Sequence, residues 1–233
     1  MSILTIIPYF LLLLSLSTCE KSKKIIYIIR HGETALNVDP TPRIRGRIPN
    51  PLNEEGIAHA RALGDFLSKE EIGKIYYSSI PRAKQTAELI AEHHSFPVEL
   101  VEDPDVIDIS WGDWEGKTFI ECFGREDGAD FFKNPQNLII PNGESFYHVM
   151  DRIRNFFVKF WLSDENICTI VSHGAVTNVI ALMITASPLE KFWSMYMEGC
   201  GVSKVRMKNV YDFEILYWNM HHFRKEGELK YLK

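Results

Sequence analysis

Two histidines stand directly behind segments that are typical of buried strands, and a glycine follows each of them. His31 comes after the apolar run 24–29, and His173 comes after the run 167–171 with Ser172 between. In open α/β sheets, ligands bind outside the carboxyl ends of the strands. A glycine after each histidine lets the backbone approach such a ligand closely. We therefore expect the two imidazoles to meet in one crevice.

Arginines accompany these histidines. Arg30 precedes the first histidine, and Arg82 lies at the start of a helix that follows another strand. Helix N-termini also favour anions, and the planar guanidinium fork matches phosphate oxygens. The chain as a whole has 26 Lys+Arg against 31 Asp+Glu, a net charge of -5. A positive cluster in a negative protein predicts a local anion site, with phosphate as the best match.

The elements that must position these residues alternate along the chain. Apolar β-branched runs predict strands, and 3.6-residue spacing predicts helices, with Asn53 as a helix cap and Pro81 at a helix start. The predicted strands are 24–29, 74–78, 98–101, 167–171, 202–207 and 213–218, and the predicted helices are 56–67, 81–91, 143–162 and 175–184. Residues 35–52 hold four prolines and are predicted as loop. This alternation favours a three-layer α/β/α sandwich with a mainly parallel central sheet.

Composition excludes several classes of protein. The 233 residues are 45% hydrophobic and 24% charged, which is ordinary for a globular domain and excludes a disordered, collagen-like or multi-span membrane protein. The negative charge argues against nucleic acid as a partner. The cysteines are widely spaced and form no CxxC pair, so neither a disulfide framework nor a metal site is predicted. They are Cys19, Cys122, Cys168 and Cys200.

Five blocks, in this order, resemble the signatures of the histidine phosphatase superfamily, the group that includes cofactor-dependent phosphoglycerate mutases. The resemblance covers residues 24 to about 223 and implies a phosphoglycerate mutase-like fold. The blocks are 30–34 (Arg-His-Gly-Glu-Thr) with Asn37 in the same loop, 78–87, 109–116, 141–145 with Arg152 beyond, and 172–174.

The resemblance also implies roles. His31 would attack phosphorus and form a phosphohistidine, without a metal or other cofactor. The residues implied to bind the phosphoryl oxygens are Arg30, Asn37, Arg82 and His173. Gly32, Glu33 and Thr34 are assigned to the same phosphate-binding loop. Glu33 is expected to contact the residues that bind the phosphate and not the phosphate itself. Of the three arginines that follow, Arg43 is expected to reach the phosphate, whereas Arg45 and Arg47 are expected to face solvent.

The acid that protonates the leaving group is where this chain departs from the family. The family carries Glu immediately before the block 109–116, but this chain has Asp108. Asp is one methylene shorter, and a displacement of about 1 Å can lower a rate on the order of 100-fold. Three interpretations stay open: Asp108 acts as the acid from a shifted backbone, Asp105 or Glu115 replaces it, or the protein is a weak phosphatase that binds phosphorylated ligands.

The resemblance favours the phosphatase branch, which includes the α-ribazole phosphate phosphatases and broad-specificity phosphomonoesterases. Family mutases carry a longer insertion before the second histidine, and here that region is compact. We expect a phosphomonoesterase for a small phosphorylated metabolite, with a 2,3-bisphosphoglycerate-dependent mutase as the alternative. The irregular region 117–142 is expected to form a cap that sets specificity. The aromatic residues of 111–132 are expected to pack in the core or cap, with lining of the substrate pocket by some of them as the alternative. Oligomeric state stays open.

The N-terminal segment 1–23 is set apart from the domain at 24–233. Residues 3–18 contain no charge, but 16 residues are short for a membrane span of about 20. Cys19 after Leu16-Ser17-Thr18 resembles a bacterial lipoprotein cleavage site and is a lipidation candidate. The lysines that follow allow an uncleaved anchor with a cytoplasmic catalytic part instead. Membrane-anchored or exported location is the expectation, with a cytoplasmic location as the alternative.

Overall fold

The computed structural model describes residues 24–124 and 129–223. The segment 1–23, including Cys19, lies outside the described residues, so its expected role as a signal or anchor stays a prediction. Within the described residues, no helix is both long enough and apolar enough to cross a membrane.

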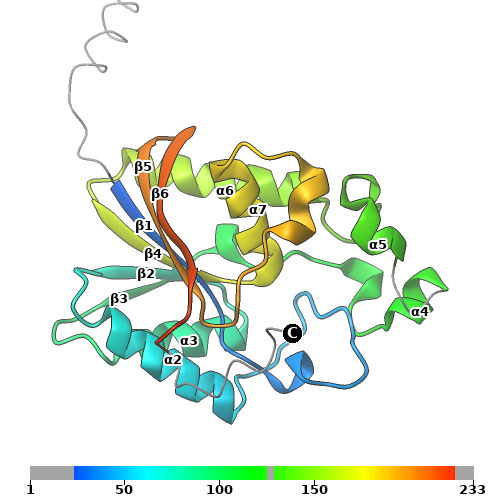
Figure 1. Ribbon diagram of the computed structural model, residues 1–233, viewed down its shortest axis with the longest axis horizontal. Helices are drawn as coiled ribbons and strands as arrows, with labels where there is room; N and C mark the ends of the chain where they lie inside the picture. Colours follow the sequence, from blue (N-terminus) through cyan, green and yellow to red (C-terminus); the bar gives the residue numbers. More distant parts are fainter. Residues whose placement is uncertain (1–23, 125–128, 224–233) are drawn as a thin grey trace, which may run out of the picture.

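A six-stranded sheet forms the centre of the molecule (Figure 1), with the strand order β3-β2-β4-β1-β5-β6. The four strands at the β3 side pair in parallel, as predicted, while β5 runs antiparallel to β1 and β6 antiparallel to β5. The strands are β1 (Lys24–Arg30), β2 (Lys74–Tyr77), β3 (Glu99–Glu102), β4 (Ile167–Ser172), β5 (Val202–Asn209) and β6 (Asp212–Met220).

Helices cover both faces of the sheet. In Figure 1, α2 (Glu54–Leu67) and α3 (Pro81–Ala91) lie below it, and α6 (Phe146–Leu162) and α7 (Gly174–Ile184) lie above. The central strand β1 shows why both faces are covered. Its Ile26 and Ile28 enter one apolar cluster while Tyr27 and Ile29 enter the other, because successive side chains of a strand point to opposite faces. The predicted three-layer sandwich is confirmed.

Capping residues fix where the helices begin. The side chain of Asn53 accepts a hydrogen bond from Gly56 N at 2.8 Å, and Ser145 Oγ accepts one from His148 N at 3.2 Å. Pro81 is the first residue of α3, where its missing N–H removes no helical bond. These helices start within a few residues of the predicted motifs, so their caps also fix the loops that carry those motifs.

In the described part of the region 117–142 the elements are short, and they lie at the right-hand end of Figure 1. They include α4 (Phe119–Phe123), α5 (Ala129–Lys133) and a 3-10 helix at Pro135–Asn137. The other 3-10 turns are η2 (Ala35–Asn37), η3 (Pro104–Val106), η4 (Gly112–Trp114) and η6 (Leu189–Ser194).

Candidate active site

The strand register brings the two predicted histidines together. In the parallel pair β1–β4, Arg30 lies opposite Ser172, so the residues that follow them leave the sheet side by side. The backbone N–H of His31 donates to Ser172 O at 2.9 Å, and the rings of His31 and His173 have centroids 5.1 Å apart. The two imidazoles therefore meet, as predicted, but only His31 lines the cavities at this site, because His173 is fully buried behind it.

His31 is held in one tautomer. Its Nδ1 lies 2.7 Å from the carbonyl oxygen of Gly32, which can only accept, so Nδ1 carries the proton. Nε2 therefore presents a lone pair, and Arg82 Nε donates to it at 3.1 Å. Burial, then the charges of Arg82 and Arg30, hold the pKa of His31 well below its usual value. The ring is a neutral imidazole whose free nitrogen faces guanidinium groups.

Arg82 is the most constrained cation of the site, because its side chain is only 2% exposed. Its Nη2 donates to Gly46 O at 2.7 Å and to Asp108 Oδ2 at 2.9 Å. Its Nη1 donates to Asn50 Oδ1 at 2.6 Å and to Ile48 O at 3.1 Å. The predicted loop 35–52 therefore wraps around this guanidinium. Sequence reasoning did not single out Asn50, since an asparagine among loop prolines has no distinguishing pattern.

His173 and Asp108 complete the buried cluster. His173 Nε2 lies 2.7 Å from Ser78 Oγ, and its Nδ1 is buried without a hydrogen-bond partner, 3.6 Å from Asp108 Oδ2. Burial, then Arg82 and His31, lower the pKa of His173 well below its usual value. Burial raises the pKa of Asp108, and Arg82 opposes that effect. A carboxyl group with a raised pKa thus stands beside two neutral imidazoles.

The structure distinguishes the three carboxylates that the sequence left open. Only Asp108 among them contacts Arg82. Asp105 instead pairs with Lys159 at 2.6 Å, and Glu115 Oε1 accepts the backbone N–H groups of Trp111 and Arg47 at 3.0 and 3.1 Å. The geometry therefore favours Asp108 as the carboxyl group that serves this site.

The remaining predicted residues of the first motif divide into two sets. Arg30 lines the cavity in front of His31. Its Nη1 donates a hydrogen bond to Met197 O at 2.6 Å, and its guanidinium group lies 5.1 Å from the centroid of the Tyr196 ring. Asn37 Oδ1 accepts from the N–H and hydroxyl groups of Thr34 at 3.0 and 2.8 Å. Its amide nitrogen is left as a donor toward the cavity that Asn37 lines.

Thr34, Gly32 and Glu33 support this loop. Thr34 is fully buried and lies behind Asn37. Gly32 N donates to Thr86 Oγ1 at 3.1 Å. Glu33 Oε1 accepts from Asn53 Nδ2 at 2.7 Å, which ties the motif to the cap of α2.

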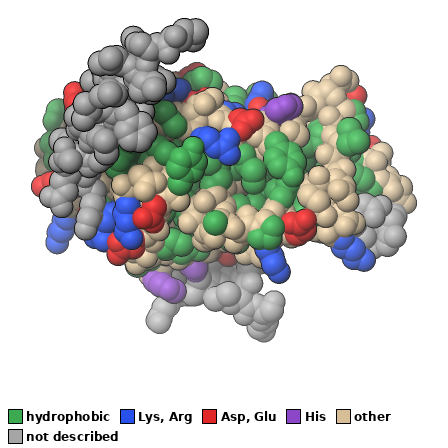
Figure 2. Space-filling view, turned by 90° about the horizontal axis from the view of Figure 1, so that it is seen from above, with side chains coloured by type: hydrophobic (Ala, Val, Ile, Leu, Met, Phe, Trp, Pro, Cys, Tyr) green, Lys and Arg blue, Asp and Glu red, His purple; other side chains and the backbone are tan. Residues whose placement is uncertain are grey.

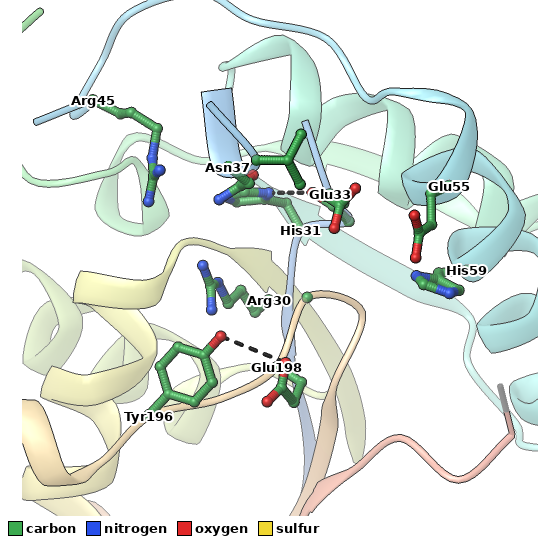
Figure 3. Close-up of a pocket in the computed structure, with 12 residues that line it drawn as sticks. Arg30, His31, Glu33, Asn37, Arg45, Glu55, His59, Tyr196 and Glu198 are labelled. Carbon is green, nitrogen blue, oxygen red and sulfur yellow. Dashed lines mark hydrogen bonds between the residues drawn. The ribbon is translucent and has the colours of Figure 1, made fainter. Parts of the chain in front are cut away.

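The three arginines after the motif do not lie as expected. Arg43 donates to Gly116 O at 2.8 Å and is exposed at the mouth of the site. Arg45 is the one that extends toward Arg30 and lines the cavity beside it (Figure 3). Burial, then the nearby charges of Arg30 and Arg82, lower the pKa of Arg45. The expectation that Arg45 faces solvent is wrong: its Nη1 donates to Leu36 O at 2.9 Å, and the chain turns at the next residue, Gly46, with a φ of +51°.

The expectation for Arg47 is also wrong. Its Nε donates to the backbone oxygen of Asp108 at 3.0 Å, and its Nη2 lies 2.9 Å from Glu144 Oε2. Ser145 caps α6, while Glu144 accepts from Ser110 N at 3.0 Å and pairs with Arg152 at 3.4 Å. Glu144 therefore joins the segment of Asp108 to α6 and to the arginine loop.

Two cavities meet at His31 and share Arg30, Arg45 and Tyr196. One, of about 290 Å³, is shown in Figure 3; we call it the polar cavity, because its lining adds the side chains of Glu33, Glu55, His59 and Glu198. The other, of about 260 Å³, is lined by Arg82, Asp108 and Asn178 together with five aromatic rings, so these aromatic residues do more than pack in the core or cap. We call it the aromatic cavity, and its rings are Trp111, Phe119, Phe131, Phe132 and Trp193.

The described residues contain no group of three or more His, Cys, Asp or Glu side chains arranged to hold a metal ion. The site around His31 consists instead of three arginines, two histidines and the carboxyl group of Asp108. Two buried nitrogens there, Arg30 Nε and His173 Nδ1, have no hydrogen-bond partner. Both can donate, so the site fits the oxygens of an anion.

Comparison with known proteins is consistent with this arrangement. The chain is 37% identical over 165 residues to the metal-independent phosphoserine phosphatase of Arabidopsis thaliana, covering 69% of this chain and 68% of that protein. It is 29% identical over 179 residues to the adenosylcobalamin/alpha-ribazole phosphatase of Salmonella typhimurium, covering 75% and 87%.

Among solved structures, YhfR of Bacillus stearothermophilus superposes with a TM-score of 0.77 at 29% identity, over 86% of this chain and all of that one. The family model of the histidine phosphatase superfamily (branch 1) matches residues 26–221. With its histidine pair, arginine cluster and carboxyl group at one sheet edge, the chain belongs to the histidine phosphatase superfamily and is a phosphatase.

Proposed function

We propose that this protein is a metal-independent phosphomonoesterase that works through a phosphohistidine on His31. The observation that carries the proposal is the tautomer of His31. Its Nδ1–H is fixed on Gly32 O, so the lone pair of Nε2 points toward Arg82. A neutral, oriented imidazole among guanidinium groups is what nucleophilic attack on a phosphate dianion requires.

In the first step, His31 Nε2 attacks phosphorus and the bond from phosphorus to the ester oxygen breaks. Arg30, Arg45 and Arg82 bind the equatorial oxygens and stabilise their charge. Arg82 Nε, which donates a hydrogen bond to His31 Nε2 in the free enzyme, donates instead to a phosphoryl oxygen of the substrate. Asp108 gives its proton to the leaving oxygen, and its raised pKa keeps a fraction of the carboxyl group protonated for this purpose.

In the second step, water attacks the phosphohistidine and the phosphorus–nitrogen bond breaks. The Asp108 carboxylate accepts the proton of that water, so inorganic phosphate leaves and Asp108 is again protonated. His31 returns to the neutral ring that its low pKa favours. The cycle closes without a net change in the enzyme.

The substrate class that we propose is a small phosphorylated molecule. The cavities at His31 have volumes of about 290 and 260 Å³, which suit a small ester. The names of the relatives, a phosphoserine phosphatase and an alpha-ribazole phosphatase, support hydrolysis of monoesters.

The test is phosphate release from 4-nitrophenyl phosphate by the full chain in EDTA, beside His31→Ala and His222→Ala. We expect the parent and His222→Ala, which changes an exposed histidine, to be equally active. We expect His31→Ala to lose about 1,000-fold or more, because the nucleophile is gone. Mass spectrometry after an acid-free quench should find the phosphoryl group on His31. Turnover that requires 2,3-bisphosphoglycerate would instead indicate a mutase.

A further inference from the structure

The leaving group of a substrate has a defined place in this site. The carboxyl group that protonates the leaving oxygen is Asp108, and Asp108 lines the aromatic cavity. The described lining of the polar cavity does not include it. Because the leaving oxygen must lie within hydrogen-bond reach of its acid, the alcohol part of the ester extends into the aromatic cavity.

The rings of this cavity hold each other in place. Phe131, 4% exposed, is the base, and its ring centroid lies 4.7 Å from that of Trp193 and 5.1 Å from that of Trp111. Trp193 Nε1 donates to Phe131 O at 3.0 Å. Phe132 stands at the rim, 44% exposed, with its centroid 5.1 Å from Trp193 and 5.4 Å from Phe119. The rings form a fixed apolar wall beside the phosphate site.

Polar groups are few on this wall. Outside the groups that face the phosphate, the polar side chains of the lining are Arg43 at the open mouth, Tyr196, and Asn178, whose buried Oδ1 has no hydrogen-bond partner. Against the faces of the five rings, a polar alcohol would lose water without gaining hydrogen bonds. A flat aromatic group would stack on the rings and displace poorly bonded water.

We propose that this phosphatase selects monoesters whose alcohol carries a flat apolar aromatic group, which stacks in the aromatic cavity. The inference rests on the proposed function, since it places the leaving oxygen beside Asp108. It differs from a preference for a small zwitterionic ester, whose ammonium group would have to reach Glu33, Glu55 or Glu198 in the polar cavity.

The experiment compares kcat/KM of the full chain for 2-naphthylmethyl phosphate, n-propyl phosphate and phosphoethanolamine. All three leaving groups are primary alcohols, so the apolar and aromatic character of the alcohol is the main variable. We expect naphthylmethyl phosphate to exceed both others by about 10- to 100-fold, the range that stacking of one base-sized ring on aromatic side chains gives.

The variant Phe132→Ala removes a rim ring that is 44% exposed and lies outside the buried core clusters, so the core keeps its packing. It should lower the ratio of kcat/KM for naphthylmethyl over propyl phosphate by about tenfold. Tyr147→Ala is the matched control, since Tyr147 is an aromatic residue of α6 that is 58% exposed and outside the aromatic cavity. That control should leave both constants unchanged.

Calorimetry of the binding of 2-naphthylmethylphosphonate and propylphosphonate separates the phosphatase mechanism from the proposed role of the aromatic cavity. Preferential binding of the naphthyl compound that Phe132→Ala removes, without hydrolysis of any ester, would uphold the cavity assignment and overturn the phosphatase mechanism. Hydrolysis with equal kcat/KM for the naphthyl and propyl esters, or with phosphoethanolamine preferred, would overturn the cavity assignment and leave the phosphatase intact.

Discussion

Asp108 shows how a shorter acid can still serve the site. Its Oδ2 lies 2.9 Å from Arg82 Nη2, and Oδ1 accepts the N–H of Ile109 at 3.0 Å. Arg47 holds the backbone oxygen of the same residue. Hydrogen bonds thus hold both carboxyl oxygens and the backbone oxygen of Asp108. In this position the side chain reaches Arg82 without the additional methylene of a glutamate.

The variant Asp108→Asn should separate the two steps of the reaction. Asn cannot protonate an alkyl leaving oxygen, so hydrolysis of n-propyl phosphate should fall by about 100- to 10,000-fold. 4-Nitrophenolate leaves without an acid, so the first step should survive with that ester. Water attack still lacks its base, and a burst of one nitrophenolate per enzyme should leave phosphohistidine in place. Rapid-quench kinetics measures the burst, and equal losses for both esters without a burst would contradict this role.

At the level of elements, Glu144 joins three segments that are distant in sequence. It accepts from Ser110 N and pairs with Arg47 and Arg152, and it stands one residue before the cap of α6. Its side chain is only 22% exposed, so solvent screens these pairs less than it would at the surface. Glu144 is therefore a positioning residue for Asp108.

We expect Glu144→Gln to lower the free energy of unfolding by about 1–3 kcal/mol, because two arginines lose their charged partner. Since Arg47 holds the Asp108 peptide, kcat for propyl phosphate should fall more than kcat for 4-nitrophenyl phosphate. Asp151→Asn, which breaks an exposed pair with Arg154, should change stability by less than about 1 kcal/mol. Equal losses of kcat for both esters would leave Glu144 a purely structural role.

The contact between α2 and the first motif makes a separate prediction. A Cβ on Gly56 would overlap the backbone of Glu33, which also accepts the N–H of Asn53 at 3.0 Å. We expect Gly56→Ala to destabilise the fold by about 1–3 kcal/mol, because neither backbone can move freely. Gly73→Ala is the matched control, since a Cβ there meets nothing within 4 Å, and it should change stability by less than about 1 kcal/mol. Urea titration measures both, and equal midpoints would refute the overlap.

The elements were largely predictable from the sequence because their signals are local. The spacing of apolar residues, the Asn53 cap and Pro81 at a helix start are each recognised from a few adjacent residues. The predicted helices and strands accordingly begin within three residues of where the structure has them. Meeting of His31 and His173 followed from the rule for strand ends. The positions of Arg45 and Arg47 did not, because they depend on a left-handed turn at Gly46 and on Glu144, a partner 97 residues beyond Arg47.

For the whole molecule, the positive site is a local feature. The net charge is -5, and on the face seen in Figure 2 charged groups of both signs are interspersed among apolar ones. The buried centre instead places Arg30, Arg45 and Arg82 close to two histidines. Folding therefore brings like charges together and keeps both imidazoles neutral, which links stability to pH.

That link predicts how stability changes between pH 7.5 and 5.5. His31 and His173 have pKa values lowered by burial and by neighbouring arginines, so below about 6.5 the unfolded chain binds more protons than the folded one. The free energy of unfolding should therefore fall as pH falls below 6.5, and these two groups contribute up to about 2.7 kcal/mol per pH unit. The raised pKa of Asp108 acts in the opposite sense, because as pH falls through that raised pKa the folded chain binds a proton that the unfolded carboxylate does not yet bind.

Urea titrations at several pH values measure this slope for the parent, His31→Asn and His222→Asn. His31→Asn should lose about half of the contribution of the pair, because one of the two buried neutral rings is gone. His222→Asn, which alters an exposed ring, should keep the slope of the parent. A slope that is the same in all three proteins would show that the His31 ring is protonated in the folded state as readily as in the unfolded chain, and its tautomer could then not supply the free lone pair on Nε2.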